Sequence, residues 1–114
     1  MREMQLIDYT DFEKIDIRAG RITRAEDFPR ARKPAYKLWI DFGEIGIKQS
    51  SAQITSLYSK DELPGKMVAA VINFPPKQVA DFISEVLVLG VVVNEKDVVL
   101  LTPDRDVPTG KKIL

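Results

Sequence analysis

Cysteine and histidine are both absent from the 114-residue sequence. Without cysteine the chain has no disulfide and no thiolate nucleophile, and without either residue it has no Cys/His zinc site. The lack of histidine also excludes a Ser-His-Asp triad, because no imidazole is present to act as the base. The carboxylates of Asp16, Asp41 and Glu44 fall on different predicted elements, and no pair has an acid/base or metal-binding spacing. We therefore expect a binding module that uses no cofactor and no metal, and not an enzyme.

An excess of charge of one sign is also missing, as are long apolar runs. The 17 Lys and Arg residues balance 17 Asp and Glu residues, which counts against nucleic-acid binding through bulk positive charge. No apolar run reaches the length of a membrane span, and the first residues lack the apolar stretch of a signal peptide. We expect a cytoplasmic protein without membrane insertion, folded as a single domain over residues 1–114.

Alternation of apolar and polar residues is typical of strands. It predicts five main strands and one short further strand, at residues 15–22, 36–42, 45–48, 66–73, 86–92 and 98–101. Gly20 interrupts the alternation of the first strand, which predicts a bulge or a sharp coil there. The segment between the first two strands, residues 24–34, is a polar, basic loop.

A helix is predicted directly after the third strand. Ser50 and Gln53 have the spacing of a capping box, and three apolar residues behind them share one helical face: Ile54, Leu57 and Tyr58. The free N–H groups of a helix N-terminus suit an anion, and Lys48 and the hydroxyls of Ser50 and Ser51 stand beside them. The alternative is that the serines only cap the helix.

The order strand, strand, strand, helix, strand, strand is that of an all-β, five-stranded OB-fold barrel, with a short helix between strands three and four. This fold binds ligands across strands two and three, between the first and fourth connecting loops. The expected binding face gathers basic and aromatic residues from both strands and both loops: Lys37, Trp39, Lys48, Arg30, Arg32, Lys33, Lys77 and Gln78.

Trp39 falls on the polar side of the second strand, and the outward position of this large aromatic side chain needs an explanation. It is either covered, by an N-terminal turn or by another subunit, or it is a stacking or hydrophobic platform for a ligand. The spacing of Thr10 and Glu13 predicts such a turn over residues 11–14, preceded by an apolar lead. A lone turn of this kind must pack on the domain or on another subunit. The C-terminal extension, residues 102–110, reads as an extended, turn-rich tail.

Several runs resemble a known family. Residues 12–22, FEKIDIRAGRI, resemble the opening of the tRNA-binding OB domain, which is shared with C-terminal extensions of methionyl-tRNA synthetases. Five further runs are similar to the CsaA branch of that group: residues 37–43, 46–55, 73–76, 84–90 and 98–101. The sequence departs from the wider group in having Val86-Leu87 after Ser84-Glu85, where a Gly-Met pair is common. It also has Ala80-Asp81 near the position of a usual glycine.

The resemblance implies a cytoplasmic, export-related chaperone that forms a homodimer and binds unfolded polypeptide, tRNA or both. It suggests that the N-terminal turn and the C-terminal tail contribute to the dimer contact. The residues carried over as ligand-binding are Lys48, Gln49, Ser50, Ser51, Asn73 and Ser84.

Two hypotheses remain for the function. The leading one is a chaperone that holds unfolded or export-bound polypeptides in an apolar groove near Trp39, Phe82 and Ile83, with the export translocase as a possible partner. In it, Lys48, Arg30 and Arg32 select acidic or polar flanks. The rival is a tRNA-binding protein that recognises tRNA shape through the same face, with the salt dependence of phosphate contacts.

Overall fold

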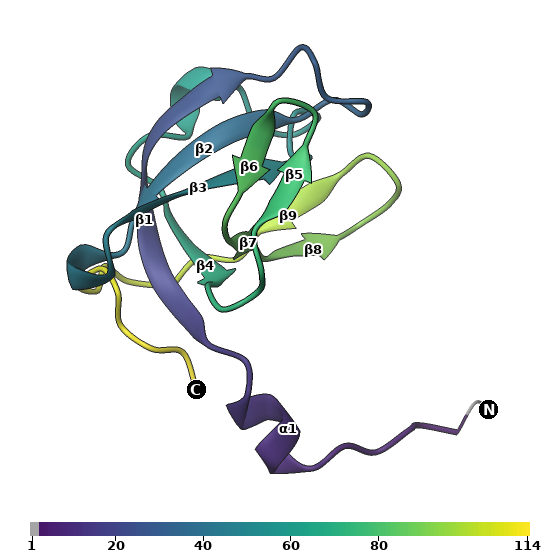
Figure 1. Ribbon diagram of the computed structural model, residues 1–114, viewed down its shortest axis with the longest axis vertical. Helices are drawn as coiled ribbons and strands as arrows, with labels where there is room; N and C mark the ends of the chain where they lie inside the picture. Colours follow the sequence, from purple (N-terminus) through teal and green to yellow (C-terminus); the bar gives the residue numbers. More distant parts are fainter. Residues whose placement is uncertain (1–2) are drawn as a thin grey trace.

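The computed structural model describes residues 3–114, so the first two residues of the expected domain lie outside it. Five strands form one sheet in the order β3–β2–β1–β4–β7, and it curls into a nearly closed, OB-fold-like barrel (Figure 1). The strands are β1 (Ile17–Asp27), β2 (Tyr36–Asp41), β3 (Ile47–Ala52), β4 (Met67–Val71) and β7 (Leu87–Val88). Two hairpins pack beside the barrel: β5 (Lys77–Val79) with β6 (Phe82–Ser84), and β8 (Gly90–Val92) with β9 (Val98–Leu100). The predicted fold class is confirmed.

Polar groups close the barrel between β3 and the segment that follows β6. The Glu85 N–H donates to the Gln49 carbonyl oxygen at 2.8 Å, and the Gln49 N–H donates to the Glu85 carboxylate at 3.0 Å. Two residues further along β3, the Ser51 N–H donates to the Ser84 hydroxyl at 3.0 Å. These bonds satisfy backbone groups that an edge strand otherwise leaves unpaired. The KQSS run therefore completes the barrel wall.

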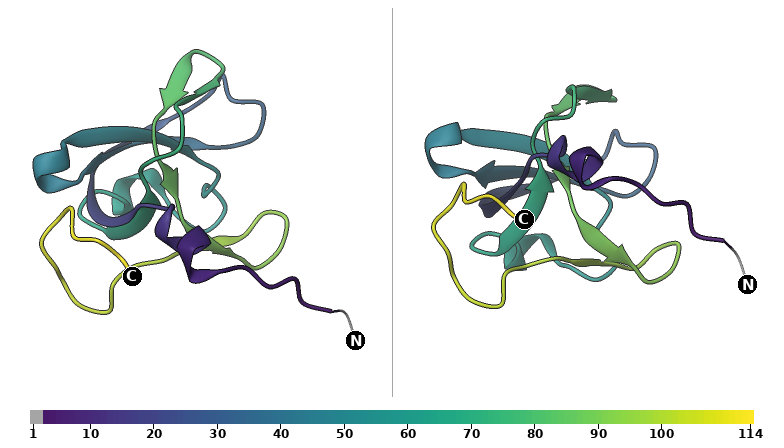
Figure 2. Two further views of the ribbon diagram at one scale, coloured as in Figure 1. Left: turned by 60° about the horizontal axis from the view of Figure 1, so that its bottom comes forward. Right: turned by 90° about the horizontal axis from the view of Figure 1, so that it is seen from below.

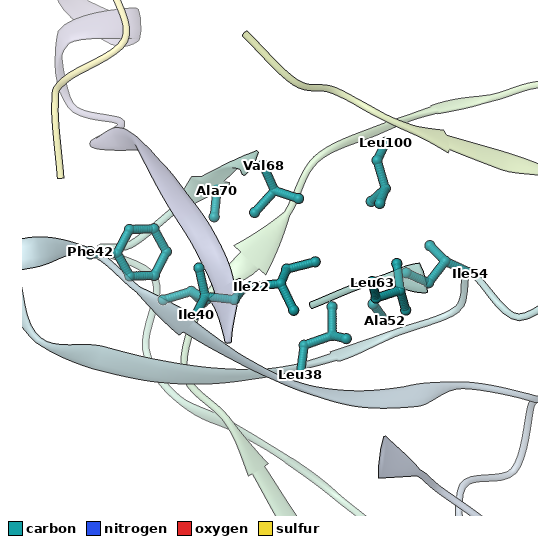
Figure 3. Packing of buried hydrophobic residues seen from close by; sticks show 11 residues of the cluster. Ile22, Leu38, Ile40, Phe42, Ala52, Ile54, Leu63, Val68, Ala70 and Leu100 are labelled. Atoms are coloured by element: carbon teal, nitrogen blue, oxygen red, sulfur yellow. The ribbon is translucent and has the colours of Figure 1, made fainter. Parts of the chain in front are cut away.

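The core fills the barrel interior with alternate residues of the strands. Ile22 of β1 is paired with Ile40 of β2, so both side chains point inward, and each is almost fully buried. Ten buried residues of this cluster are labelled in Figure 3: Ile22, Leu38, Ile40, Phe42, Ala52, Ile54, Leu63, Val68, Ala70 and Leu100. The period of two along each strand places these side chains on the same side of the sheet.

The helix predicted at Ser50 is wrong. Ser50 and Ser51 lie in β3, residues 55–57 form a turn, and only a single turn of 3₁₀ helix follows, at Lys60–Glu62. Pairing with β2 and the closing bonds to residues 84–86 give this segment more hydrogen bonds than the start of a short helix offers. The supposed apolar helical face does not form either, since Ile54 is buried and Leu57 is exposed. No helix N-terminus is therefore available to bind an anion at Ser50.

The orientation of β3 is also opposite to the expected one. Lys48 is paired with Ile40 and therefore lies on the inward side of the sheet, half-buried at one end of the barrel. Ile47 is paired with Asp41, points outward and is 60% exposed. Because side chains alternate, a one-residue difference in phase moves every residue of a strand to the other face. The small residues Ser50 and Ala52 face the core, and they set this phase.

The first strand is longer than predicted and its bulge is elsewhere. β1 continues to Asp27, through residues assigned to the loop, and its register with β2 shifts between Ile22 and Arg24 rather than at Gly20. Gly20 is required for a close approach instead. A Cβ there would lie 2.6 Å from the side chains of Ile40 and Phe42, closer than packed carbon atoms allow.

The two ends of the chain behave differently. The expected N-terminal helical turn is present as α1 (Tyr9–Glu13), but its N-cap is Asp8 rather than Thr10. Figure 2 shows that α1 and the arm before it extend away from the barrel. The C-terminal tail returns to β1, where the Ile113 N–H donates to Ile17 and the Gly110 N–H donates to Ala19. No helix among residues 3–114 is long and apolar enough to span a membrane.

Candidate ligand-binding face

The outward side of β1, β2 and β3 forms one continuous surface, called the outer face below. The strand pairing arranges it in three rows across the sheet: Arg21–Asp41–Ile47, Arg24–Trp39–Gln49 and Glu26–Lys37–Ser51. Loop 28–35 lies at one end of β1 and β2. The β5–β6 hairpin, which Figure 1 places in front of β2 and β3, packs against this loop.

Trp39 is half-buried in an aromatic cluster on the outer face. Its ring meets Phe82 of the hairpin edge-on at 5.9 Å, and Phe82 meets Phe28 of the first loop at 5.5 Å. The outward Trp39 is thus covered by the chain's own hairpin and loop. The alternative that α1 covers it is wrong, and a ligand platform at Trp39 would be a ring already partly covered by Phe82.

Two cations lie over the rings of this cluster. The Arg24 guanidinium is 4.5 Å from the centre of the Trp39 ring, and it also pairs with the Glu26 carboxylate. The Lys37 ammonium is 5.0 Å from the Phe28 ring and 5.4 Å from the Phe82 ring. Cations are attracted to aromatic faces in this geometry. The outer face therefore presents positive charge mounted on aromatic rings.

The β5–β6 hairpin is fastened to the outer face at three points. Phe82 packs in the aromatic cluster, the Gln49 side-chain amide donates to the Ile83 carbonyl oxygen at 2.7 Å, and Arg30 lies 3.4 Å from the Asp81 carboxylate. The two-residue turn of the hairpin contains Ala80 with a φ of 52°, a left-handed conformation that favours glycine.

The expected basic residues do not all meet on this face. Arg30 reaches the hairpin, while Arg32 and Lys33 are exposed on loop 28–35, and Lys77 is exposed at the start of β5. Lys33 borders a separate hollow on the side of the β8–β9 hairpin. Lys48 points to the inward side of the sheet, so Lys37 and Arg24 are the cations at the centre of the outer face.

The other predicted ligand residues form internal hydrogen bonds. Gln49, Ser50, Ser51 and Ser84 take part in barrel closure, and Ser50 is only 1% exposed. The Asn73 side chain donates to the Lys14 carbonyl oxygen at 2.8 Å and accepts from the Asp16 N–H at 2.9 Å. Asn73 therefore fixes the junction between α1 and β1. Ligand binding by these five residues remains a prediction.

Sequence reasoning missed Arg21, Arg24 and Ile47 as outer-face residues. Arg24 was assigned to a loop, and Ile47 to the core. The outward position of Ile47 could have been predicted from Ser50 and Ala52. Their small side chains suit the narrow interior, and because side chains alternate along a strand, Ile47 then points outward.

Three groups with perturbed pKa values lie away from the centre of the outer face. A hydrogen bond to Asp16 raises the pKa of Arg18, and one to Asp27 raises the pKa of Lys60. The pKa of Asp97 is lowered by hydrogen bonds from Ser56 and Asn94. Within residues 3–114, no group of three or more carboxylates is placed to hold a metal ion.

A second exposed set of residues is strongly apolar. It comprises the arm before α1, the first residue of α1, and the β8–β9 hairpin with its flanks: Met4, Leu6, Ile7, Tyr9, Val91, Val92, Val93, Val99 and Leu101. Val92, for example, is 74% exposed. Exposed apolar side chains that gather on a surface are typical of interaction sites.

Comparisons with known proteins agree with the barrel. The putative tRNA binding domain family matches residues 17–112. The crystal structure of the chaperone CsaA from Bacillus anthracis str. Ames superposes with a TM-score of 0.93 at 54% identity, covering 96% of this chain and all of that one. The CsaA chaperone protein of Picrophilus torridus gives a TM-score of 0.88 at 60% identity with the same coverage.

A methionine–tRNA ligase of Methanocaldococcus jannaschii is 35% identical over 111 residues. The match covers 97% of this chain and 17% of the ligase, so the chain spans a small part of that enzyme's length. Most of the strands, the barrel closure and the outer face lie within the matched residues 17–112. The chain belongs to the putative tRNA binding domain family, in the branch that contains the CsaA proteins.

Proposed function

We propose that this chain is a non-enzymatic, homodimeric chaperone of the cytoplasm that binds unfolded or export-bound polypeptides on the outer face. The observation that carries the proposal is the combination of exposed apolar side chains with ring-mounted cations on one surface. Ile47 is 60% exposed in the row beside Arg24 and Trp39, and Ile83 is 43% exposed on the hairpin strand that bonds to Gln49. The CsaA chaperones of high identity support this reading.

In this mechanism an extended segment lies along the outer face beside the β5–β6 hairpin. Its apolar side chains contact Ile47 and Ile83, which removes apolar surface from water. Its acidic or polar groups meet the Arg24 and Lys37 cations. No covalent bond is made or broken, so the client is held and released by equilibrium binding. The export translocase is the partner to which such a client would pass.

We propose that the homodimer forms through the second exposed set of apolar residues. The arm before α1 extends from the barrel, and the β8–β9 hairpin carries exposed valines, so each copy offers an apolar arm and an apolar hairpin. The C-terminal tail contributes less than expected, because residues 110–113 bond to β1 of the same chain. Two outer faces on one dimer would bind a long polypeptide with added avidity.

A holdase assay tests the proposal. Purified protein is added to a chemically unfolded client, and client aggregation is followed by light scattering. We expect suppression by the natural chain and by Leu57→Asp, in which an exposed leucine outside the outer face is changed. Ile47→Asp should weaken suppression about tenfold, because it places a charge where an apolar side chain is bound. Equal suppression by both variants would show that the outer face is not the client site.

A tRNA-binding function is the second candidate, favoured by membership in the putative tRNA binding domain family and by the cations over the rings. It predicts that affinity falls steeply with salt, because phosphate binding releases counterions. Lys37→Ala should lower the slope of log affinity against log salt by about one unit if Lys37 contacts a phosphate. An unchanged slope would remove Lys37 from a tRNA interface.

A further inference from the structure

A hollow of about 750 Å³ opens beyond the end of β3, outside the centre of the outer face. Three segments distant in the sequence form its walls: loop 28–35, the chain after β3, and the tip of the β8–β9 hairpin. They contribute Lys33, Gln53, Thr55, Ser56, Lys96 and Val98, among others. Its volume is within the range of small-molecule sites and exceeds what a single inorganic anion fills.

Two of these walls are tied together by hydrogen bonds. The Ser56 hydroxyl donates to the Asp97 carboxylate at 2.6 Å, and the Asn94 amide donates to the same carboxylate at 2.9 Å. The Asn94 side-chain oxygen in turn accepts the N–H groups of Lys96 and Asp97, each at 2.9 Å. These bonds hold the tip of the hairpin, and with it the backbone of Lys96, against the chain after β3. A site held in this way loses little conformational entropy on binding.

The lining of the hollow carries two lysines and one carboxylate, Glu95, and the Asp97 carboxylate is hydrogen-bonded to Ser56 of the lining. Lys33 and Lys96 come from opposite segments, and among residues 3–114 neither forms an ion pair with a carboxylate. An anion bound in the hollow would be attracted by both ammonium groups. Each also offers three donors to a phosphate.

The rest of the lining fits the other parts of a nucleotide. Pro34 and Val98 supply apolar surface for a flat ring. The Gln53 amide carries both a donor and acceptors, as the edge of a base requires, and the Glu95 carboxylate accepts from sugar hydroxyls. Apolar walls with a few polar groups are typical of small-molecule sites. We propose that this hollow binds a nucleotide through Lys33, Lys96 and Gln53, either free or as the end of an RNA strand. The site does not depend on the polypeptide-binding function of the outer face.

Nuclear magnetic resonance on the full chain tests the proposal. The ¹⁵N-labelled protein is titrated with adenosine monophosphate, and separately with adenosine and with inorganic phosphate. We expect saturable shifts confined to residues 53–56 and 94–98 with the monophosphate, and at least tenfold weaker binding of either part alone. Lys96→Ala should weaken monophosphate binding about tenfold, as expected when a charge-assisted hydrogen bond is lost. Lys111→Ala, which removes an exposed lysine outside the hollow, is the matched control and should leave the affinity unchanged.

Titration with a short oligonucleotide distinguishes a free nucleotide from the end of an RNA strand as the ligand. If the oligonucleotide shifts the same residues and competes with the monophosphate, the ligand is an RNA end, and if it does not, the ligand is a free nucleotide. The proposal is overturned if the monophosphate gives no saturable shift at residues 53–56 and 94–98. It is also overturned if Lys33→Ala and Lys96→Ala together leave the affinity unchanged. Both results leave the holdase assay unaffected, so the failure of one function can be told from the failure of the other.

Discussion

The Ser50 hydroxyl donates a 2.8 Å hydrogen bond to the carbonyl oxygen of Val86 inside the barrel. It joins β3 to the segment after β6, next to the backbone bonds that close the wall there. Ser50 is the one polar residue among residues 3–114 that is buried, and its hydroxyl takes the place of a strand-to-strand contact. The KQSS run, residues 48–51, therefore has a structural role in closing the barrel.

Replacing Ser50 by alanine should destabilise the fold. The Val86 carbonyl oxygen would lose its donor in a buried site, which costs about 1–3 kcal/mol. Urea unfolding of Ser50→Ala measures this cost. Ser51→Ala is the control, because the Ser51 hydroxyl is half-buried and donates no hydrogen bond in the described structure. Equal stability of Ser50→Ala and the natural chain would contradict the closing role of this hydroxyl.

Ala80→Gly should stabilise the protein. The φ of 52° at Ala80 strains any residue with a Cβ by about 1–2 kcal/mol. Glycine removes that strain but adds flexibility to the unfolded chain, so the expected net gain is about 0.5–1 kcal/mol. Thermal unfolding measures it. Gly65→Ala should have the opposite sign, because Gly65 has a φ of +96° in open space and only its backbone is affected. A lower melting temperature for Ala80→Gly would contradict the proposed backbone strain at Ala80.

The pKa of Asp97 should rise when Ser56 is replaced by alanine. The Ser56 hydroxyl is the main cause of its lowered pKa, and Asn94 is the second. Since the folded pKa lies below the unfolded one, the carboxylate stabilises the fold above the unfolded pKa. This stabilisation is lost as the pH falls through the folded pKa. Titration of the Asp97 carboxyl resonance measures the shift, with Thr55→Ala as the control. An unchanged pKa in Ser56→Ala would mean that Ser56 does not hold this carboxylate.

A charge on the β8–β9 hairpin should break the proposed dimer. Val92 is 74% exposed, and in the dimer we expect it to be covered by apolar residues of the second copy. An unpaired aspartate buried at that position costs several kcal/mol. Sedimentation velocity should find a dimer for the natural chain and for Leu57→Asp, and a monomer for Val92→Asp. A dimer in all three proteins would place the interface elsewhere.

Much of the barrel followed from the sequence, because the alternation around Leu38 and Ile40 survives in the structure as burial, although Ile15 of the first predicted strand is 36% exposed. The five-stranded barrel also agreed with the expected fold class. The exception was β3, where a capping-box spacing at Ser50 and Gln53 suggested a helix. This local spacing contains no information on the pairing with β2 or on the long-range hydrogen bonds to residues 84–86. Those interactions make the segment a strand.

The binding face was predictable in part. Lys37 and Trp39 lie on it as expected, since the phase of β2 is set by four strongly apolar inward residues. The cover over Trp39 was not predictable, because it depends on how the β5–β6 hairpin folds back over the sheet. Arg24 was missed for the related reason that the bulge near Thr23 extends β1 beyond its apolar alternation.

The central claim, that the outer face binds unfolded polypeptide, is tested most directly by the fluorescence of Trp39, the single tryptophan of the chain. The natural chain, Ile47→Asp and Leu57→Asp are titrated with a permanently unfolded polypeptide that lacks tryptophan, at low and at physiological salt. We predict a saturable change that survives physiological salt, is kept in Leu57→Asp and is lost in Ile47→Asp. No response to polypeptide, together with a response to bulk tRNA that disappears as salt rises, would contradict the account and assign the face to tRNA.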